Sequence, residues 1–197
     1  MSLFDNLKDT GAAAAGQAAA GQAAGSNTGG KPVSVVFPSI PASLEAFSAL
    51  PQAAMQTPHE TAAMFVLALG LYKVDKNISI AMINYLKGPQ PMSQRDISFL
   101  ADRMAQNGKI AFIAESYFSG ATPQNDYAPA EPYTVVISEN PYSYQEQGYA
   151  RLFAHSGGAD SPRSITMRQA KDGKWYLWEY SSILLDIRAP ESTNPWA

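Results

Sequence analysis

The sequence contains no cysteine among its 197 residues, and it contains only two histidines. The absence of cysteine excludes disulfide bonds, thiolate metal sites and cysteine nucleophiles together. It also fits a reducing compartment. Two histidines are too few for a zinc site built from several imidazoles of one chain. We therefore expect neither a metal nor a cofactor.

Charged residues are scarce as well, because Asp, Glu, Lys and Arg make up 16% of the chain, below the usual quarter. The 14 basic and 17 acidic residues give a net charge of −3. Nucleic-acid binding depends on an excess of clustered Lys and Arg side chains. This balance gives no such footprint, so we expect no nucleic-acid partner.

Long apolar runs are also missing. No stretch reaches about 18 consecutive apolar residues, which predicts no transmembrane segment. The first ten residues, MSLFDNLKDT, have neither a cationic leader nor an apolar run of about 7–15 residues, so they do not read as a secretory signal. We therefore expect a cytoplasmic protein.

Small residues dominate the N-terminal part of the chain. Residues 11–25 read GAAAAGQAAAGQAAG, in which the unit AAAGQ occurs twice. No large side chain is present for burial and the repeated Gly weakens a helix, so the composition predicts a flexible linker. We expect a tail and linker over residues 1–32, a single domain over 33–190, and a C-terminal tail over 191–197.

Ahead of this linker, Leu3, Phe4 and Leu7 would lie on one side of a short helix. One interpretation is a docking or membrane-surface peptide. The other is a frayed chain start. One Lys against two Asp in the first ten residues gives a net charge of −1, which disfavours anionic lipid.

Helix signals fill the first half of the predicted domain. SLEAFSAL, at 43–50, predicts a short helix. TPHE, at 57–60, supplies a Thr N-cap, a Pro at the first helical position and a Glu that closes a capping box. The residues that follow are apolar or Gly on every side, which is typical of a buried helix. Two further helices are predicted at about 77–87 and 94–106.

Strand patterns follow the helices, with one strand ahead of them. VSVVFPSIP, from residue 33, predicts an edge strand that Pro38 ends. Further strands are predicted at 109–118, 133–138, 148–155, 164–169 and 174–184. Because helices come first and strands afterwards, the sequence predicts an α+β fold. We expect about three to four helices packed on a C-terminal antiparallel β-meander of four to five strands.

The last two predicted strands are joined by KDGK, in which Asp172-Gly173 is a preferred two-residue turn. This turn fixes the register, because side chains alternate between the two faces of a strand. It places Met167 opposite Trp178 as a sulfur–aromatic contact in the core. The face predicted to lie against the central helix carries the aromatic residues Tyr176, Trp178 and Tyr180.

Two carboxylates are candidate general acids or bases. Glu179 stands between two aromatic residues, and surroundings of that kind raise a carboxyl pKa toward catalytic values. Glu115 lies in a similar apolar stretch. The simpler interpretation of Glu179 is an ion pair with Arg168. Catalysis would require a pocket of roughly several hundred Å³ that opens onto one of the two carboxylates.

Candidate binding residues lie mainly in loops. The stretches NDYAPAEPYTV and NPYSYQEQGY are rich in Tyr, which is favoured at contact surfaces, although packing of these loops on the sheet is an equal alternative. We select Tyr127, Tyr142, Tyr144, Arg163 and Arg168.

The loop HSGGADSPR, at 155–163, combines His155, Asp160 and Ser161 and so has the composition of a catalytic triad. The GxSxG nucleophile elbow is absent, however. A hairpin connector is the simpler interpretation, with Arg163 as its most suitable contact for an anion or ligand.

Four segments carry a resemblance to a known family: YFSGATPQNDYAPAEPYTV, ENPYSY, GYARLFAHSGGADSPR and DGKWYLWEYSSIL. Over roughly residues 50–190 the chain resembles an uncharacterised family of bacterial domains of unknown function, found in Clostridia-type bacteria. The resemblance implies a bacterial source and supplies no activity. A looser, fold-level likeness is to nuclear transport factor 2-like or cystatin-like α+β domains, which pack helices into a curved sheet.

These observations favour a non-enzymatic binding or interaction domain behind a flexible linker. Its partner would be a protein or a small ligand, or a second copy that pairs through an exposed strand. The alternative is a small-molecule enzyme with a cone-shaped pocket and a carboxylate acid/base.

Overall fold

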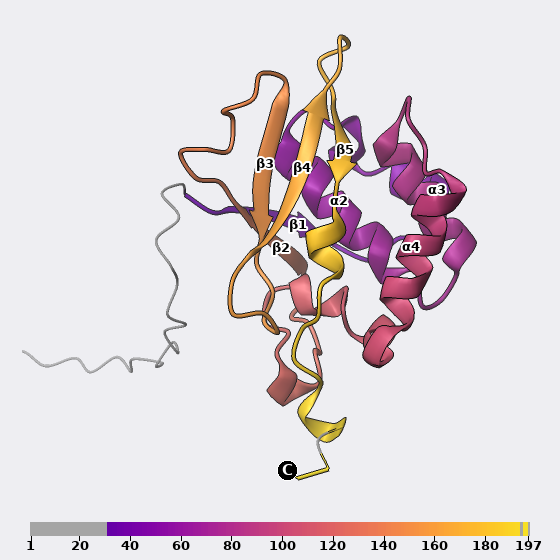
Figure 1. The fold of residues 1–197 in the computed structure, drawn as a ribbon, viewed down its shortest axis with the longest axis vertical. Helices are drawn as coiled ribbons and strands as arrows, with labels where there is room; N and C mark the ends of the chain where they lie inside the picture. Colours follow the sequence, from indigo (N-terminus) through magenta and orange to yellow (C-terminus); the bar gives the residue numbers. More distant parts are fainter. Residues whose placement is uncertain (1–30, 194, 197) are drawn as a thin grey trace, which may run out of the picture.

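The computed structural model describes residues 31–193, 195 and 196, so the predicted linker and N-terminal peptide lie outside the described part. Within it, one antiparallel sheet is covered on one side by helices (Figure 1). This arrangement confirms the predicted α+β class. The strands are β1 (Val33–Phe37), β2 (Tyr133–Ser138), β3 (Tyr149–Ala154), β4 (Arg163–Gln169) and β5 (Trp175–Glu179). The α-helices are α1 (Leu44–Ser48), α2 (Pro58–Gly70), α3 (Lys76–Lys87) and α4 (Gln94–Ala105).

The strands follow the order β1-β2-β3-β4-β5, and each pairs antiparallel with the next. β1 precedes all the helices in sequence, yet it pairs with β2 from Val33 opposite Ile137 to Phe37 opposite Tyr133. The predicted edge strand is therefore confirmed, and β5 forms the other edge. Each remaining strand is joined to the next by a hairpin connection, which gives the predicted meander.

Helix α2 is the centre of the molecule. Its N-terminus carries the predicted capping box, in which Thr57 accepts from the backbone of Glu60 and the Glu60 carboxylate accepts from the backbone of Thr57. Every residue from Thr61 to Gly70 is buried. The helix crosses behind the sheet in Figure 1. Because α2 lies between the sheet and the other helices, every side of it is buried, which explains why it is apolar on every side.

Side chains fill the space between α2 and the sheet. Large residues of α2, among them Met64, Phe65 and Leu67, are 0% exposed. The inner face of the sheet is equally buried, with Phe37, Ile137, Leu152, Ile165, Met167 and Leu177. In the part of the chain that the structure describes, no residue of α2 lines any of four surface hollows, so none of these is the cone-shaped pocket that the enzyme hypothesis requires. The opposite face of β3, β4 and β5 is open to solvent.

Helices α3 and α4 lie beyond the β5 edge of the sheet (Figure 1). Asp75 caps α3 by accepting from the backbone N–H groups of Asn77 and Ile78. Ser93 and Asp96 form the predicted capping box of α4. These caps supply acceptors for N–H groups that a helix start leaves without intrahelical partners.

The predicted strand at 109–118 is wrong, because the segment forms short 3-10 turns, Gln106–Ala111 and Glu115–Tyr117. Asn107 and Gly108 have φ values of 53° and 66°, which turn the chain tightly after α4. Lys109 is then drawn inward, where its Nζ donates to the Leu184 carbonyl. Only Phe118 makes a strand-like bridge, to Val135.

The predicted register of the last hairpin is also wrong. Ala170 N–H donates to the Lys174 carbonyl, so the turn contains three residues, and Gly173 occupies its last position with φ 82°. This shifts β5 by one residue and places Leu177 opposite Met167 in the core. Trp178 is 39% exposed on the far side. An irregularity beside Thr166 then restores the predicted pairing with Glu179.

No helix within the described part of the chain is long and apolar enough to cross a membrane.

Candidate binding site

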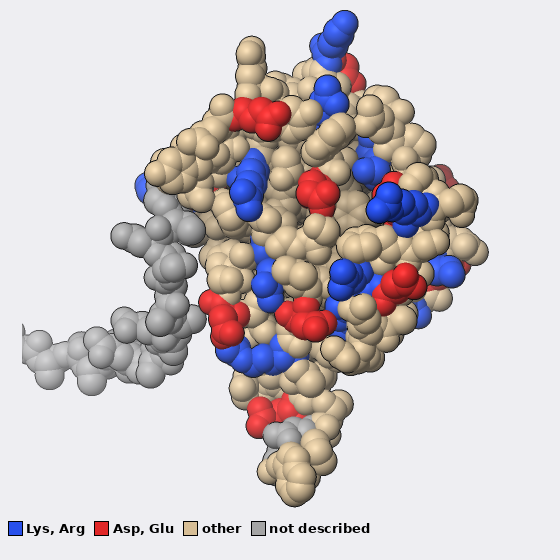
Figure 2. Space-filling view, in the orientation of Figure 1, with Lys and Arg blue, Asp and Glu red and all other residues tan. Residues whose placement is uncertain are grey.

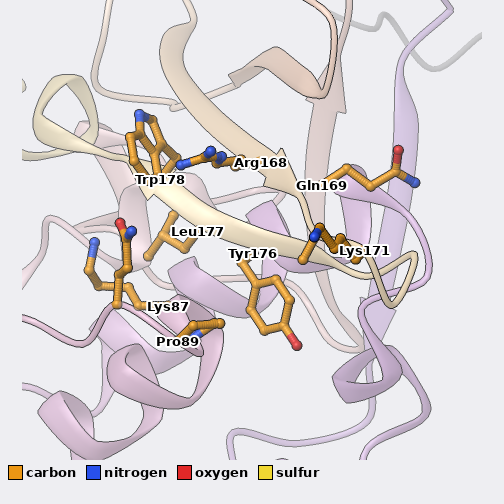
Figure 3. A pocket seen from close by; sticks show the side chains of 10 residues that line it. Lys87, Pro89, Arg168, Gln169, Lys171, Tyr176, Leu177 and Trp178 are labelled. Atoms are coloured by element: carbon orange, nitrogen blue, oxygen red, sulfur yellow. The ribbon is translucent and has the colours of Figure 1, made fainter.

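A groove of about 290 Å³ follows β5, the outer strand of the sheet. Its walls come from the end of α3, the loop after it, and the β4–β5 hairpin. In Figure 3, Arg168 and Trp178 lie on one side of the β5 ribbon, and Lys87 and Pro89 lie on the other. The side chains that matter for its chemistry are Lys87, Arg168, Lys171, Tyr176 and Trp178.

Tyr176 lines the groove and packs on Gly88, which lies between the lining residues Lys87 and Pro89. Gly88 ends α3 with φ 56° and ψ −116°, a conformation that residues with a side chain rarely adopt. The Tyr176 ring packs directly on it, and a Cβ at position 88 would overlap ring carbons of Tyr176. Glycine is therefore required for two reasons, its backbone conformation and this close contact.

The Tyr176 hydroxyl donates to Oδ2 of Asp172 at 2.8 Å, which fixes the ring from the hairpin side. Asp172 also accepts from the backbone N–H of Lys174 at 3.0 Å. That backbone bond, followed by the tyrosine bond, lowers the pKa of Asp172. The hydrogen bond between the Tyr176 hydroxyl and Asp172 also raises the pKa of Tyr176. The carboxylate is thus occupied in shaping the hairpin.

Arg168 forms a ladder with two aromatic rings. Its guanidinium carbon lies 4.7 Å from the ring centroid of Trp178 and 5.4 Å from that of Tyr149. The two rings meet edge to face, with centroids 5.7 Å apart. Cation–π contacts at exposed sites contribute about 0.5–1 kcal/mol each. The ladder therefore holds a positive charge at a defined place on the open face of the sheet.

The three cations of the groove form no direct ion pair with a carboxylate in the part of the chain that the structure describes. Within the described part of the chain, none of the four ion pairs involves Lys87, Arg168 or Lys171. Lys87 instead lies 5.8 Å from the ring centroid of Tyr180. Asp96 lies in the adjoining hollow, where its carboxylate closes the α4 capping box and attracts Lys87 without forming an ion pair with it. The groove is thus a positive site on a chain whose net charge is negative.

A second hollow, of about 390 Å³, lies on the open face between β3 and the 139–147 loop. It is lined by Asn140, Tyr142, Glu146, Tyr149, Arg151 and Phe153, among others. Tyr149 belongs to both the hollow and the arginine–aromatic ladder. The hollow and the groove are therefore adjacent parts of one surface.

The two candidate catalytic carboxylates line neither of these hollows, nor two smaller ones, one beside the groove and one lined by residues 117–122 and 155–157. Glu179 is exposed and accepts from the backbone N–H of Ser181 at 2.6 Å, and the predicted ion pair with Arg168 does not form. Glu115 is half-buried, 2.5 Å from Nζ of Lys73. Each carboxylate is thus engaged by a neighbouring group of the same chain.

The three candidate tyrosines have different environments. Tyr127 is 1% exposed, stacks on Phe112 with centroids 5.4 Å apart, and donates to the Arg188 carbonyl. It is a packing residue, which corrects the prediction of a contact surface there. Tyr142 and Tyr144 are 67% and 48% exposed. Tyr144 donates to Glu139, and partial burial, followed by this bond, raises its pKa to about 12.

The 155–163 loop does not assemble a triad. His155 Nε2 lies 2.9 Å from Oγ of Ser138, which is 2% exposed, and Asp160 pairs with Arg188. The Arg163 guanidinium donates to the Asp186 carbonyl at 2.8 Å, so it joins the loop to the C-terminal segment. Among the described residues, no group of three or more His, Cys, Asp or Glu side chains could hold a metal ion.

Of the predicted binding residues, only Arg168 lines the groove, and Tyr142 lines the second hollow. Sequence reasoning missed Lys87, Lys171, Tyr149 and Trp178 as site residues. Gly88 directly after a predicted helix indicates a turn of the chain. It does not predict the contact between Gly88 and Tyr176, which is far along the chain. That contact depends on the hairpin register.

The fold and the groove define a small α+β domain with an open surface that carries cations and aromatic rings. A family model for a domain of unknown function, DUF6935, matches residues 39–191, which is most of the chain. The chain therefore belongs to the DUF6935 family. No curated protein and no solved structure matches it.

Proposed function

We propose that this protein is a non-enzymatic binding domain that takes an anionic, partly apolar ligand in the groove along β5. The observation that carries the proposal is a set of three cations around the rings of Tyr176 and Trp178, none of which forms an ion pair within the described part of the chain. Charge-assisted hydrogen bonds from Lys and Arg are among the strongest polar contacts to carboxylates and phosphates. The rings supply apolar area beside them.

The arrangement suits binding better than catalysis. A general acid or base must lie within hydrogen-bonding reach of the group it serves. The groove contains no carboxylate, histidine or serine among its lining residues, while Glu115 and Glu179 are engaged elsewhere. Cations and rings alone hold a ligand in place, so the groove is best explained as a recognition site.

A bacterial source and a cytoplasmic location, which fits the absence of cysteine, are part of the same proposal. The proposal also keeps the division of the chain into an N-terminal tail and linker over 1–32, one domain over 33–190 and a C-terminal tail over 191–197. It includes, in addition, the fold-level likeness to nuclear transport factor 2-like domains. The antiparallel sheet packed on a central helix supports that likeness.

Phenyl phosphate tests the groove, because it combines one ring with a compact anion. We expect NMR titration to shift the amide signals of Lys87, Gly88, Gln90 and residues 168–178 and the indole signal of Trp178. Lys87→Gln combined with Arg168→Gln should weaken binding about two- to thirtyfold, since exposed charge contacts contribute about 0.2–1 kcal/mol each.

Lys76→Gln is the matched control, because Lys76 is exposed at the opposite end of α3 and lines none of the hollows. It should leave the titration unchanged. Equal binding by the wild type and the double variant would refute the proposal, as would shifts confined to other parts of the domain.

A further inference from the structure

We infer that the natural ligand is an acidic, extended segment of a partner protein, which crosses from the groove over the arginine–aromatic ladder into the second hollow. This inference rests on the proposed function of the groove and extends it to the partner and its path.

The first support is the continuity of the surface. Arg168 and Trp178 line the groove, Tyr149 lines the second hollow, and the contacts at 5.4 and 5.7 Å join them. β3 and β5 are separated by one strand, so the path across them is about 10 Å long. An extended chain covers that distance in about three residues. A segment of roughly six to eight residues would fill both hollows as well.

The second support is charge complementarity. The residues that line the two hollows include four cations, Lys87, Arg168, Lys171 and Arg151, and one acid, Glu146. The whole chain has the opposite balance, with 14 basic and 17 acidic residues. Figure 2 shows blue side chains at the tip of the β4–β5 hairpin and others toward the helices, with red ones interspersed. Carboxylates spaced along a peptide would meet this dispersed set of cations.

The third support is the shape and composition of the surface. The groove, at about 290 Å³, is at the lower limit of about 300–1,000 Å³ for enclosed small-molecule sites. Trp, Tyr and Arg are the residues that contribute most at protein–protein interfaces. Trp178, Tyr149, Arg168 and the exposed Tyr142 occur here on two neighbouring hollows. A polypeptide uses such a strip more fully than a small anion does.

A competition between two probes tests the inference on the full chain. One probe is phenyl phosphate, and the other is a fluorescein-labelled Glu-rich peptide that carries two Leu residues. We expect the peptide to bind at least about tenfold more tightly, and to lose affinity as salt rises. Tyr142→Ala and Arg151→Gln should each weaken peptide binding about two- to fivefold and leave phenyl phosphate binding unchanged.

The outcomes separate the two proposals. If both probes bind through Lys87 and Arg168, but the peptide is no tighter or is unaffected by Tyr142→Ala and Arg151→Gln, the ligand is a small anion and the inference is wrong while the proposed function stands. If neither probe responds to the groove variants, the proposed function fails and the inference fails with it. Circular dichroism of each variant checks that the fold is intact.

Discussion

Lys109 joins the turn after α4 to the C-terminal segment of the domain. Its side chain is 2% exposed, and Nζ donates to the Leu184 carbonyl at 2.7 Å and to Oδ1 of Asp186 at 3.0 Å. The hydrogen bond from Lys109 is the largest cause of a lowered pKa at Asp186. The buried ammonium therefore satisfies a carbonyl that water does not reach easily.

Lys109→Met tests this role, because Met has a similar length and no donor. We expect the free energy of unfolding to fall by about 1–3 kcal/mol, the usual result of leaving a buried polar group without its partner. Urea denaturation monitored by circular dichroism measures the change.

Asp186→Asn is the comparison variant, since Asp186 is 66% exposed and its ion pair is accessible to solvent. It should cost less than Lys109→Met. A Lys109→Met protein as stable as the wild type would show that the buried bond to Leu184 contributes nothing.

At the scale of elements, the helix starts were the most predictable features. Thr57 with Glu60, and Ser93 with Asp96, act through residues three positions apart, so the sequence alone contains the whole interaction. The apolar run after Thr57 likewise predicted a buried helix, because a helix that is apolar on every side can be recognised from the sequence alone. Strand β1 was predictable from its β-branched residues and Pro38.

The errors arose where tertiary contacts decide between local alternatives. Asp172-Gly173 suits a two-residue turn, but it also suits the end of a three-residue turn, in which Gly173 has φ 82°. The register that forms buries Leu177 beside Met167 and exposes Trp178. In that register, the Tyr176 ring packs closely on Gly88. The candidate groove was missed for the same reason, because Trp178 was assigned to the core.

A pair of substitutions tests this register directly. Leu177 is 2% exposed and Trp178 is 39% exposed. Leu177→Ala should lower the free energy of unfolding by about 2–5 kcal/mol, as core truncations of Leu do. Trp178→Ala should cost no more than about 1 kcal/mol, although it removes more atoms.

Thermal and urea unfolding of both variants decide the matter. If Trp178→Ala is the more damaging substitution, the hairpin has the two-residue turn and Trp178 faces α2. Surface packing of Trp178 on Arg168 would then also be excluded, and the proposed site would lose its ladder.

At the scale of the whole molecule, titration of the two histidines connects pH to stability. Burial lowers the pKa of His59. The negative charges of Glu139, whose carboxylate lies 3.6 Å from Nε2 of His59, and of Glu60 raise this pKa, but by less. Burial also lowers the pKa of His155. The folded state thus binds these protons less readily than the unfolded chain, in which a histidine pKa is about 6.5.

Stability should therefore be highest above about pH 6.5 and should fall as the pH is lowered through the window between that value and the folded-state pKa values. Asp96, Asp172 and Asp186 also have lowered pKa values, but their usual value is 3.8, so their contribution is lost only in more acidic solution. Between about pH 7.5 and pH 5.5 the two histidines should determine the slope.

Urea midpoints across that range, for the wild type, His59→Gln, His155→Gln and the double variant, measure each contribution. We expect each single variant to flatten the pH dependence in part and the double variant to remove most of it. Glu139 links this effect to the binding surface, because its carboxylate contacts both His59 and the Tyr144 hydroxyl of the 139–147 loop. A double variant that keeps the full slope, or a wild type that gains stability as the pH falls, would show that burial of the histidines does not control it.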